Sequence, residues 1–334
     1  MKHWTQAIGD LAPGDLNCAR FDWSEYEIRS LTQNDQELFD RVYSLMWEEF
    51  GEKGELERPQ VLYERLAWDP LQIRNGRSLA YEILVILKNH EIIAFRDHSI
   101  ITTPQASILT SVIHLSHAWI KLEYRRLGIS GWLRSWPIQK ARECLKKHEL
   151  LSDSLIILAA EMEHFDPHIP EKILRLRSYA KAQFKTLDPS FFKYAQPDFR
   201  SAQVIDQTGG PHPVPLALLV RKLGKENEDH ISVKEAKQVI ESIYHMYSQS
   251  IREQDMLPLW NLYHQATTQI DEHRTLKLLS PLPCDSPPQS NRQPEALPKQ
   301  TDTLIIESPE FTPPQHPLPQ LHPDTPKIRR EGSH

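Results

Sequence analysis

Half of the prolines in this chain lie near its C-terminal end, and this distribution limits how much of the chain can fold. The sequence has 334 residues and 26 prolines, and 13 of those prolines come after residue 280. Proline lacks a backbone N–H and interrupts helices and sheets, and this stretch has few apolar residues to offset its chain entropy. We therefore expect residues 280–334 to form a disordered tail, whose Pro-x-x-Pro spacings could offer polyproline ligands to a protein partner.

Residues 225–279 show helical patterns and are expected to form an extension after the main domain. Apolar residues from Ser232 to Gln254 recur at steps of three and four, which gathers them on one face of a helix. Ser232 and Glu235 have the spacing of a capping box at the start of this helix. A second helix, less clearly patterned, is predicted from Met256 to Leu278. The apolar face predicts packing on the main domain or on a second copy of the chain.

Residues 1–224 are predicted to form the main domain, in which strand and helix patterns alternate. Two apolar runs rich in β-branched residues, Tyr81–Leu87 and Ile92–Ile101, are separated by a short polar turn and predict a hairpin. A strand at Ser107–Lys121 then leads into a helix. A buried strand at Leu155–Ala160, another helix and a strand pair follow. This order predicts an α/β (α+β) fold, with a mixed central sheet covered by helices on both faces.

Charge and composition exclude several classes of partner. The 39 Lys and Arg against 45 Asp and Glu give a formal net charge of −6, which argues against general binding to nucleic acids or anionic membranes. Three separated cysteines, Cys18, Cys144 and Cys284, form no CxxC pair and predict no disulfide framework. No apolar run approaches the roughly 20 residues of a membrane span, and the N-terminus lacks the apolar core of a signal peptide. We expect a cytoplasmic protein.

The segment from His117 to Leu133 joins an apolar strand to a helix through a basic turn that contains Gly128. The first amides of a helix have no intrahelical acceptor, and the helix dipole adds partial positive charge there. Glycine lets a phosphate approach the backbone, and Arg125 and Arg126 add full charges. The turn therefore predicts an anion-binding cradle. An ordinary strand-to-helix connection has the same local pattern, so the turn alone leaves both interpretations open.

Together with the order of elements, this turn resembles the acyl-CoA-binding motif of the GNAT superfamily of N-acetyltransferases, Gln/Arg-x-x-Gly-x-Gly/Ala. Arg125 to Ser130 fit the motif, with Ser130 in place of the final Gly or Ala. The resemblance covers about residues 22–224 and implies a mostly antiparallel sheet. It also implies that the strand backbone pairs with the pantetheine arm and that amides of the turn hold the CoA pyrophosphate. The cofactor-binding residues expected on this basis are Ala118, Trp119, Ile120, Arg125, Arg126, Leu127, Gly128, Ile129, Ser130 and Gly131.

A second match begins at Tyr179, where Tyr-Ala-Lys-Ala-Gln-Phe is similar to the family ending Tyr-x-Lys-x-Gly-Phe. The resemblance implies that Tyr179 protonates or hydrogen-bonds the departing CoA thiolate. A phenol suits an acid that must stay protonated at neutral pH. Packing in the core is the alternative interpretation of this tyrosine. Departures from the family pattern are Ser130, Gln183 in place of Gly, Lys172 and Arg175 in place of Asn and Ala, and Pro137, which predicts a kink in its helix.

Attack by an amine requires a base that removes a proton from its ammonium form. Glu161 and Glu163 follow the buried strand at the point where the sheet of this family splays beside the thioester, and alternation places both on one face. Burial is expected to raise the pKa of such a carboxyl group. We favour Glu161 as the base, with a solvated acid at the strand end as the alternative. His117, and His98 together with Asp97, are further candidates.

These features predict direct transfer of an acetyl group from acetyl-CoA to an amine in a ternary complex, with acetyl-CoA as co-substrate. No metal is expected, because Pro167 and Pro170 predict a loop where Glu161, His164 and His168 would need a helix to share a metal. The alternative function is a non-catalytic GNAT-fold module that senses acyl-CoA or recruits a protein. The amine acceptor and the oligomeric state, a homodimer included, stay open.

Overall fold

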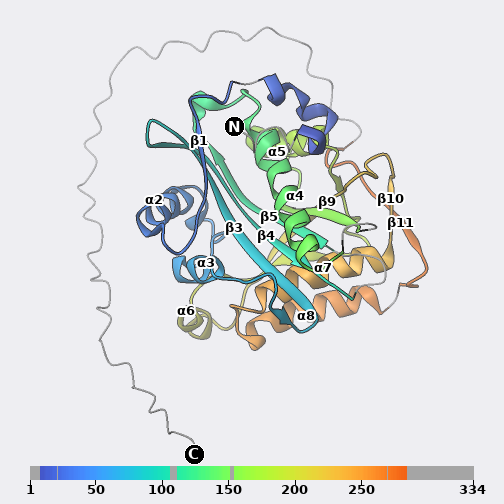
Figure 1. Cartoon of the computed structure of the whole chain (residues 1–334). Coiled ribbons are helices and arrows are strands. Elements are labelled where there is room, and N and C mark those ends of the chain that lie inside the picture. The colour runs from blue at the N-terminus through green and yellow to red at the C-terminus, as the bar shows by residue number, and fades with distance from the viewer. Residues whose placement is uncertain (1–7, 21, 106–110, 151–153, 269, 284–334) are drawn as a thin grey trace, which may run out of the picture. The chain divides into compact units, whose positions relative to one another are not determined.

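The computed structural model describes residues 8–20, 22–105, 111–150, 154–268 and 270–283 (Figure 1). All of these residues lie within one compact unit of the chain. The tail expected at residues 280–334 lies outside the described residues from residue 284 onward, so its disorder stays a prediction.

A mixed sheet forms the centre of this unit. Its nine described strands have the order β1-β3-β4-β5-β6-β9-β7, while β2 pairs with β3 and β8 pairs with β9. Of the neighbouring pairs in this sheet, β5 and β6 are parallel and the others are antiparallel. The expected mixed, mostly antiparallel sheet is therefore confirmed. The strands are β1 (Glu27–Ser30), β2 (Ile73–Arg74), β3 (Arg77–Lys88), β4 (Glu91–Thr102), β5 (Ser111–Ile120), β6 (Ile156–Met162), β7 (Lys185–Thr186), β8 (Tyr194–Gln196) and β9 (Val214–Lys222).

Helices cover both faces of the sheet, as the sequence predicts. On one face pack α2, α3, α7 and α8, and on the other pack α4 and α5. In Figure 1 the green helix α4 crosses in front of the strands, and the orange helices α7 and α8 lie at the lower end of the sheet. The helices are η1 (Ile8–Asp10), η2 (Pro13–Arg20), α2 (Gln36–Met46), η3 (Trp47–Gly51), α3 (Pro59–Arg65), η4 (Leu122–Tyr124), α4 (Ile129–Lys147), α5 (Pro170–Lys181), α6 (Ala202–Gln207), α7 (Val233–Tyr247) and α8 (Glu253–Thr267).

Alternation along the strands explains why both faces need helices. In β3, Leu79, Tyr81 and Ile83 face α2, α3 and α7, whereas Ala80 and Leu84 face α4 and its neighbours. Successive side chains of a strand point to opposite faces, so a strand that is apolar at nearly every position must be covered twice. The predicted hairpin is confirmed by the antiparallel pairing of β3 with β4.

The C-terminal helices complete the core on one face of the sheet. Ser232 and Glu235 form the predicted capping box at the start of α7. The long helix expected as far as Gln254 ends earlier, at Tyr247, and the helix expected as far as Leu278 ends at Thr267. The backbone at Arg252 is extended and its guanidinium holds acidic side chains, which separates α7 from α8. A short pair, β10 (His230–Ser232) with β11 (Thr275–Lys277), closes the extension.

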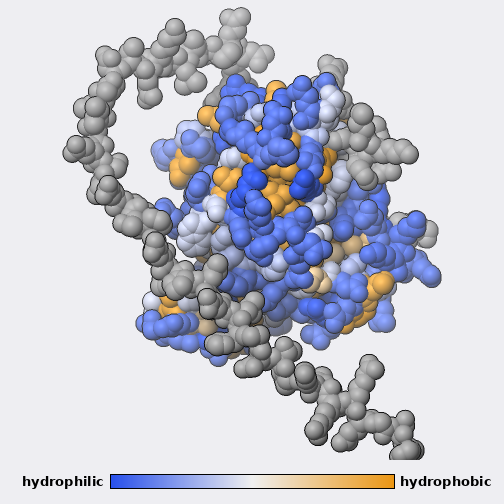
Figure 2. Space-filling model, turned by 60° about the vertical axis from the view of Figure 1, so that its left-hand side comes forward, coloured by the Kyte–Doolittle hydropathy of each residue, from blue (hydrophilic) through white to orange (hydrophobic). Residues whose placement is uncertain are grey.

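The proline inside α4 does not end this helix. The α4 helix continues through Pro137 to Lys147. No helix among the described residues is both long and apolar enough to cross a bilayer. The surface seen in Figure 2 is mostly hydrophilic, with hydrophobic side chains gathered in a central area of that face.

Candidate functional site

The parallel strands β5 and β6 stop pairing halfway along β5. Their backbone pairing runs from Ser111 with Ile156 to Leu115 with Ala160 and then ends. From Ser116 to Ile120, β5 keeps β4 as its neighbour, and no described strand pairs with its other edge. An unpaired strand edge offers backbone donors and acceptors to an extended ligand.

A β-bulge in β5 lies at the point where the pairing ends. Arg96 of β4 faces Ala118, but His98 faces Leu115, so the intervening two residues of β5 lie opposite Asp97 alone. A bulge bends its strand and increases the local twist, which turns the end of β5 away from β6. The bulge therefore accounts for the unpaired edge in structural terms.

A buried ion pair holds this bulge. Asp97 Oδ1 accepts from the backbone N–H of His117 at 2.7 Å and lies 3.1 Å from His117 Nδ1, while Tyr81 donates its hydroxyl to Oδ2 at 2.9 Å. Burial favours the neutral forms of both partners, but their mutual attraction outweighs it. It lowers the pKa of Asp97 to about 2 and raises the pKa of His117 to about 9. The pair is charged at neutral pH.

His117 is therefore poorly suited to the role of base. Its Nε2 lies 2.8 Å from the carbonyl oxygen of Glu55, so both ring nitrogens have partners. A protonated imidazole has no free lone pair with which to accept a proton. His98, the other histidine candidate, is fully buried and lies 3.1 Å from a carboxylate oxygen of Glu82.

The predicted cradle lies directly after the unpaired edge. Gly128 caps α4 with a left-handed backbone (φ 88°), and Arg126 is also left-handed (φ 69°). No side chain caps the start of α4, whereas the amide of Gly131 donates to the carbonyl oxygen of Gly128 at 3.0 Å. The amides of Ile129 and Ser130 at the helix start thus suit an anion, and that of Gly131 is already used.

The remaining cradle residues continue this strand and turn. Ala118 is exposed, and the ring of Trp119 stacks on Phe95 at 5.7 Å. Arg125 Nε donates to the carbonyl oxygen of Ile120 at 3.0 Å, which ties the turn back to the strand. The structure thus brings the ten expected cofactor-binding residues together in one continuous strand, turn and helix start. Their cofactor contacts stay a prediction.

Tyr179 lies on α5, on the sheet face covered by α4. Its side chain is buried, and its hydroxyl accepts a hydrogen bond from Arg96 Nη2 at 3.1 Å. The guanidinium of Arg134 lies 5.5 Å from the centre of the tyrosine ring. Arg134 therefore contacts the face of the ring, while Arg96 is the cation that contacts the hydroxyl. Tyr179 also packs against Phe184, so its predicted chemical role and its packing in the core coexist.

The departure at Gln183 coincides with an unusual backbone. Gln183 follows the C-terminus of α5 with a left-handed conformation (φ 67°), and its amide donates to the carbonyl oxygen of Ala180. Helices commonly end with glycine at such a position, because a Cβ makes this conformation costly. Gln183 thus adopts the left-handed conformation that glycine usually adopts at this position.

Glu161 lies on the opposite face of the sheet from Tyr179. Its carboxylate lies 3.0 Å from His114 Nε2, and it accepts hydroxyl hydrogen bonds from Tyr194 at 2.5 Å and from Tyr247 of α7 at 2.8 Å. Burial raises the pKa of Glu161, but His114 and the two hydroxyl groups outweigh this effect and lower it. The expectation of a raised pKa for Glu161 is therefore wrong, because these partners outweigh the effect of burial. The role of Glu161 as the base stays a prediction.

The acidic residue two positions later has a different environment. Glu163 accepts from Arg175 at 2.5 Å and lies 3.4 Å from Lys172 Nζ. Lys172 and Arg175 are the two residues that replace Asn and Ala in the family pattern. Their departure from that pattern thus has a structural counterpart in this chain, an ion-pair cluster between α5 and the end of β6.

A segment near the N-terminus contacts both α4 and α5 beside Tyr179. Asp15 of η2 forms a bidentate ion pair with Arg134, with oxygen-to-nitrogen distances of 2.6 and 3.1 Å. A Cβ at Gly14 would lie 2.3 Å from the carbonyl oxygen of Lys181, so this close approach requires glycine. No function for this segment was predicted from the sequence.

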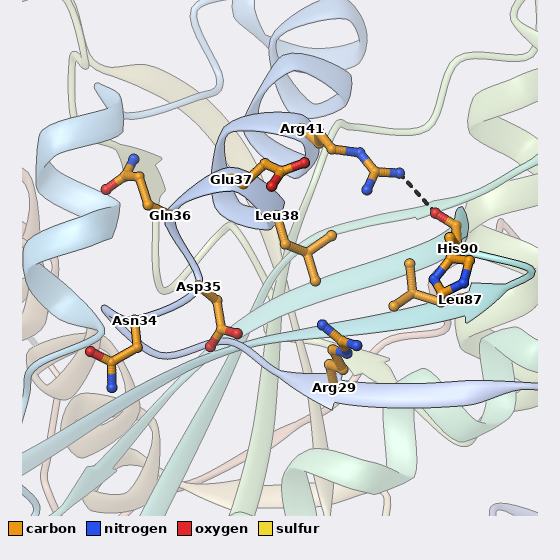
Figure 3. A pocket seen from close by; sticks show the side chains of 9 residues that line it. All are labelled: Arg29, Asn34, Asp35, Gln36, Glu37, Leu38, Arg41, Leu87 and His90. Atoms are coloured by element: carbon orange, nitrogen blue, oxygen red, sulfur yellow. Dashed lines mark hydrogen bonds between the residues drawn. The ribbon is translucent and has the colours of Figure 1, made fainter.

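A pocket among the described residues lies away from the predicted site, between β1, α2 and the β3–β4 turn (Figure 3). Arg41 donates to the carbonyl oxygen of His90 at 2.9 Å across its rim. None of the predicted site residues lines it. The lining residues are Arg29, Asn34, Asp35, Gln36, Glu37, Leu38, Arg41, Leu87 and His90. Among the described residues, no three or more His, Cys, Asp or Glu side chains are grouped to hold a metal ion.

Neither a protein-family model nor a curated protein sequence matches the chain. Solved structures of acetyltransferases are similar to it over part of its length. An aminoglycoside 6'-N-acetyltransferase complexed with coenzyme A shares 12% identity, with 59% of this chain and 96% of that chain covered and a TM-score of 0.33. Ard1 from Thermoplasma volcanium shares 12% identity, with coverage of 60% and 98% and a TM-score of 0.35.

An acetyltransferase of the GNAT family from Streptococcus pneumoniae shares 13% identity, with 60% of this chain and 100% of that chain covered and a TM-score of 0.33. The pneumococcal protein is named as a member of the GNAT family, the family that the motif at residues 125–130 resembles. At these identities and scores, the likeness assigns neither a substrate nor a mechanism to this chain.

Replacing Gln183 with glycine is expected to stabilise the protein. Gln183→Gly relieves the cost of a left-handed backbone, and we expect the free energy of unfolding in urea to rise by roughly 0.5–1 kcal/mol. Gln207→Gly is the matched control, because Gln207 is exposed at the end of α6 and has a helical backbone. We expect that control to lower the free energy of unfolding. Losses of similar size in both variants would contradict the prediction.

The His117–Asp97 pair predicts a loss of stability in alkaline solution. The pKa of His117 is about 9 in the folded protein and about 6.5 when unfolded, so its contribution is complete below about pH 6.5. It is lost as the pH rises through about 9, and the free energy of unfolding should fall by roughly 3 kcal/mol. Urea unfolding at pH 6.5 and 9.5 measures this change. An equally large fall in His117→Gln would refute the assignment.

Proposed function

We propose that this chain is a GNAT-like N-acetyltransferase that transfers an acetyl group from acetyl-CoA to an amine by direct attack in a ternary complex. The observation that carries the proposal is the unpaired edge of β5 at Ser116–Ile120, which leads directly into the Gly128 turn and the uncapped start of α4. A strand edge and a helix N-terminus in this order suit the two chemically different parts of CoA, its amide-containing arm and its pyrophosphate.

The residues of the cradle have distinct roles in this proposal. The backbone of Ala118, Trp119 and Ile120 pairs with the pantetheine arm. The amides of Ile129 and Ser130 and the charge of the exposed Arg126 bind the pyrophosphate, where the helix dipole favours negative charge.

The transfer itself needs an acid and a base. Tyr179 is the proposed acid, because its buried hydroxyl accepts from Arg96 and keeps its own proton available for donation. Glu161 is the proposed base, because its carboxylate lies near the end of β6, next to the point where β5 and β6 stop pairing. The two groups lie on opposite faces of the sheet, beside the point where β5 and β6 stop pairing. The amine acceptor is not assigned.

Calorimetric titration with acetyl-CoA tests the cradle. We expect the wild-type protein to bind acetyl-CoA and Arg126→Glu to bind it at least about 10-fold more weakly, because a phosphate-binding charge is reversed. Lys146→Glu is the matched control. It makes the same charge change at an exposed site in the last turn of α4, and its affinity should stay within about 2-fold of wild type. Absence of binding by the wild-type protein would overturn the proposed function.

Turnover with a panel of amines tests the chemistry. We expect Tyr179→Phe to reduce release of the CoA thiol by roughly 100-fold, because a positioned proton donor contributes about this much to a rate. The affinity for acetyl-CoA should stay unchanged, since the backbone and charges of the cradle are intact. Unchanged turnover in Tyr179→Phe would remove Tyr179 from the proposed mechanism.

A non-catalytic acyl-CoA-binding module is the second candidate function. The ion pair between Asp15 and Arg134 favours it, because η2 is thereby fixed against α4 and α5 beside Tyr179, where an active enzyme needs access. Binding of acetyl-CoA without thiol release, across small amines, amino acids, aminoglycosides and lysine peptides, would support this candidate over the enzyme.

A further inference from the structure

Arg96 is a buried cation with most of its hydrogen-bonding capacity unused. The residue is 2% exposed, and Nη2 donates to the hydroxyl of Tyr179. Its Nε and Nη1 atoms have no hydrogen-bond partner. No carboxylate of the described residues forms an ion pair with it.

The other buried arginines of the described chain are all paired with carboxylates. Arg65 pairs with Glu57 at 2.7 Å, Arg134 with Asp15 at 2.6 Å, and Arg221 with Glu226 at 2.9 Å. They cannot be exchanged for apolar residues without leaving a carboxylate unpaired. Burying a guanidinium without an anion carries a large desolvation cost. A cation in this state can recover part of that cost by binding an anionic ligand.

The position of Arg96 indicates where such a ligand would lie. Its backbone pairs with Ala118, on the part of β5 whose other edge is unpaired, and its side chain reaches Tyr179 on α5. The contact with Tyr179 places the guanidinium on the face of the sheet covered by α4 and α5, and the pairing with Ala118 places Arg96 beside the part of β5 that no longer pairs with β6. The resemblance to the GNAT family implies that the thioester lies at this point of the sheet.

We propose that Arg96 and Tyr179 together form a binding site for the sulfur anion of CoA. This inference rests on the proposed function. Arg96 Nη2 donates a hydrogen bond to the Tyr179 oxygen. The hydroxyl hydrogen of Tyr179 therefore points away from Arg96 and toward the sulfur. The unpartnered N–H groups of Arg96 stabilise the negative charge there.

The bonds and protons of the transfer balance in this arrangement. The amine forms the C–N bond, the C–S bond breaks, and its electron pair stays on sulfur. Tyr179 gives its proton to that sulfur, and the resulting phenolate is held by Arg96 until it regains a proton from solvent. The proton lost by the amine goes to Glu161 or to water. Arg96 thus acts both through Tyr179 and directly on the sulfur.

Calorimetry with two ligands tests this site without relying on turnover. Free CoA carries a thiol that can ionise, with a pKa near 8.5 if it resembles cysteine, whereas acetyl-CoA does not. If the site binds the thiolate, binding of CoA releases protons between about pH 7 and 8.5. Its affinity relative to that of acetyl-CoA should then rise by about 10-fold over this range. Titrations in two buffers of different ionisation enthalpy measure the proton release.

Arg96→Met is the principal variant. We expect it to abolish the proton release and the pH-dependent gain for CoA, while the affinity for acetyl-CoA stays within about 2-fold. Its thermal midpoint should be equal to or higher than that of wild type, because replacing an unpaired buried charge with an apolar side chain removes a cost. Arg126→Met is the matched control in the cradle, and it should weaken both ligands equally and leave the proton release unchanged.

The outcomes separate this inference from the proposed function. If the wild-type protein binds neither ligand, the proposed function fails and this inference fails with it. If both ligands bind and Arg96→Met keeps the proton release, only the role of Arg96 is overturned. Should Arg96→Met fold poorly, Arg96→Lys retains the charge in a smaller head group, and it should keep the release of protons. Loss of that release in Arg96→Lys together with unchanged acetyl-CoA binding would also contradict a charge-based role.

Discussion

The arrangement of the site depends on one buried ion pair, between Asp97 of β4 and His117 of β5. Asp97 lies opposite a two-residue bulge. It accepts hydrogen bonds from the backbone amide and from the ring nitrogen Nδ1 of His117, so a single carboxylate fixes the irregular stretch of β5. Without an acceptor, that buried amide would carry a desolvation cost. Because the bulge turns β5 away from β6, the pair also determines where the sheet has a free edge. The turn at Gly128 and the start of α4 come directly after this end of β5, so the direction of β5 also determines where they lie.

The sheet separates the two groups to which chemical roles are proposed. Tyr179 lies with Arg96 on the face covered by α4 and α5, and Glu161 lies with His114 and Tyr247 on the face covered by α7 and α8. The separated ends of β5 and β6 adjoin both groups. An acyl group held at this position would have a cationic environment on one side of the sheet and a carboxylate on the other. Such a division keeps the proposed acid and base from neutralising each other.

Features that depend on neighbouring residues could be predicted from the sequence. The hairpin, the strand, turn and helix around Gly128, and the capping box at Ser232 each follow from local periodicity or spacing. Interactions between distant segments could not be predicted in this way. Arg96 lies within an apolar strand run, where its charge marks it as unusual, but its contact with Tyr179 spans 83 positions. The lowered pKa of Glu161 likewise depends on Tyr247, which is 86 positions away.

The hydroxyl that α7 provides to Glu161 limits how this protein can be shortened. A fragment ending at residue 224 would lack Tyr247 and would uncover the apolar side chains of β3, β6 and β9 that α7 and α8 bury. It would therefore lose part of the core and one partner of a buried carboxylate together. The minimal unit for expression and for crystallisation thus extends at least through β11, although the motif that resembles an acyl-CoA site ends long before it.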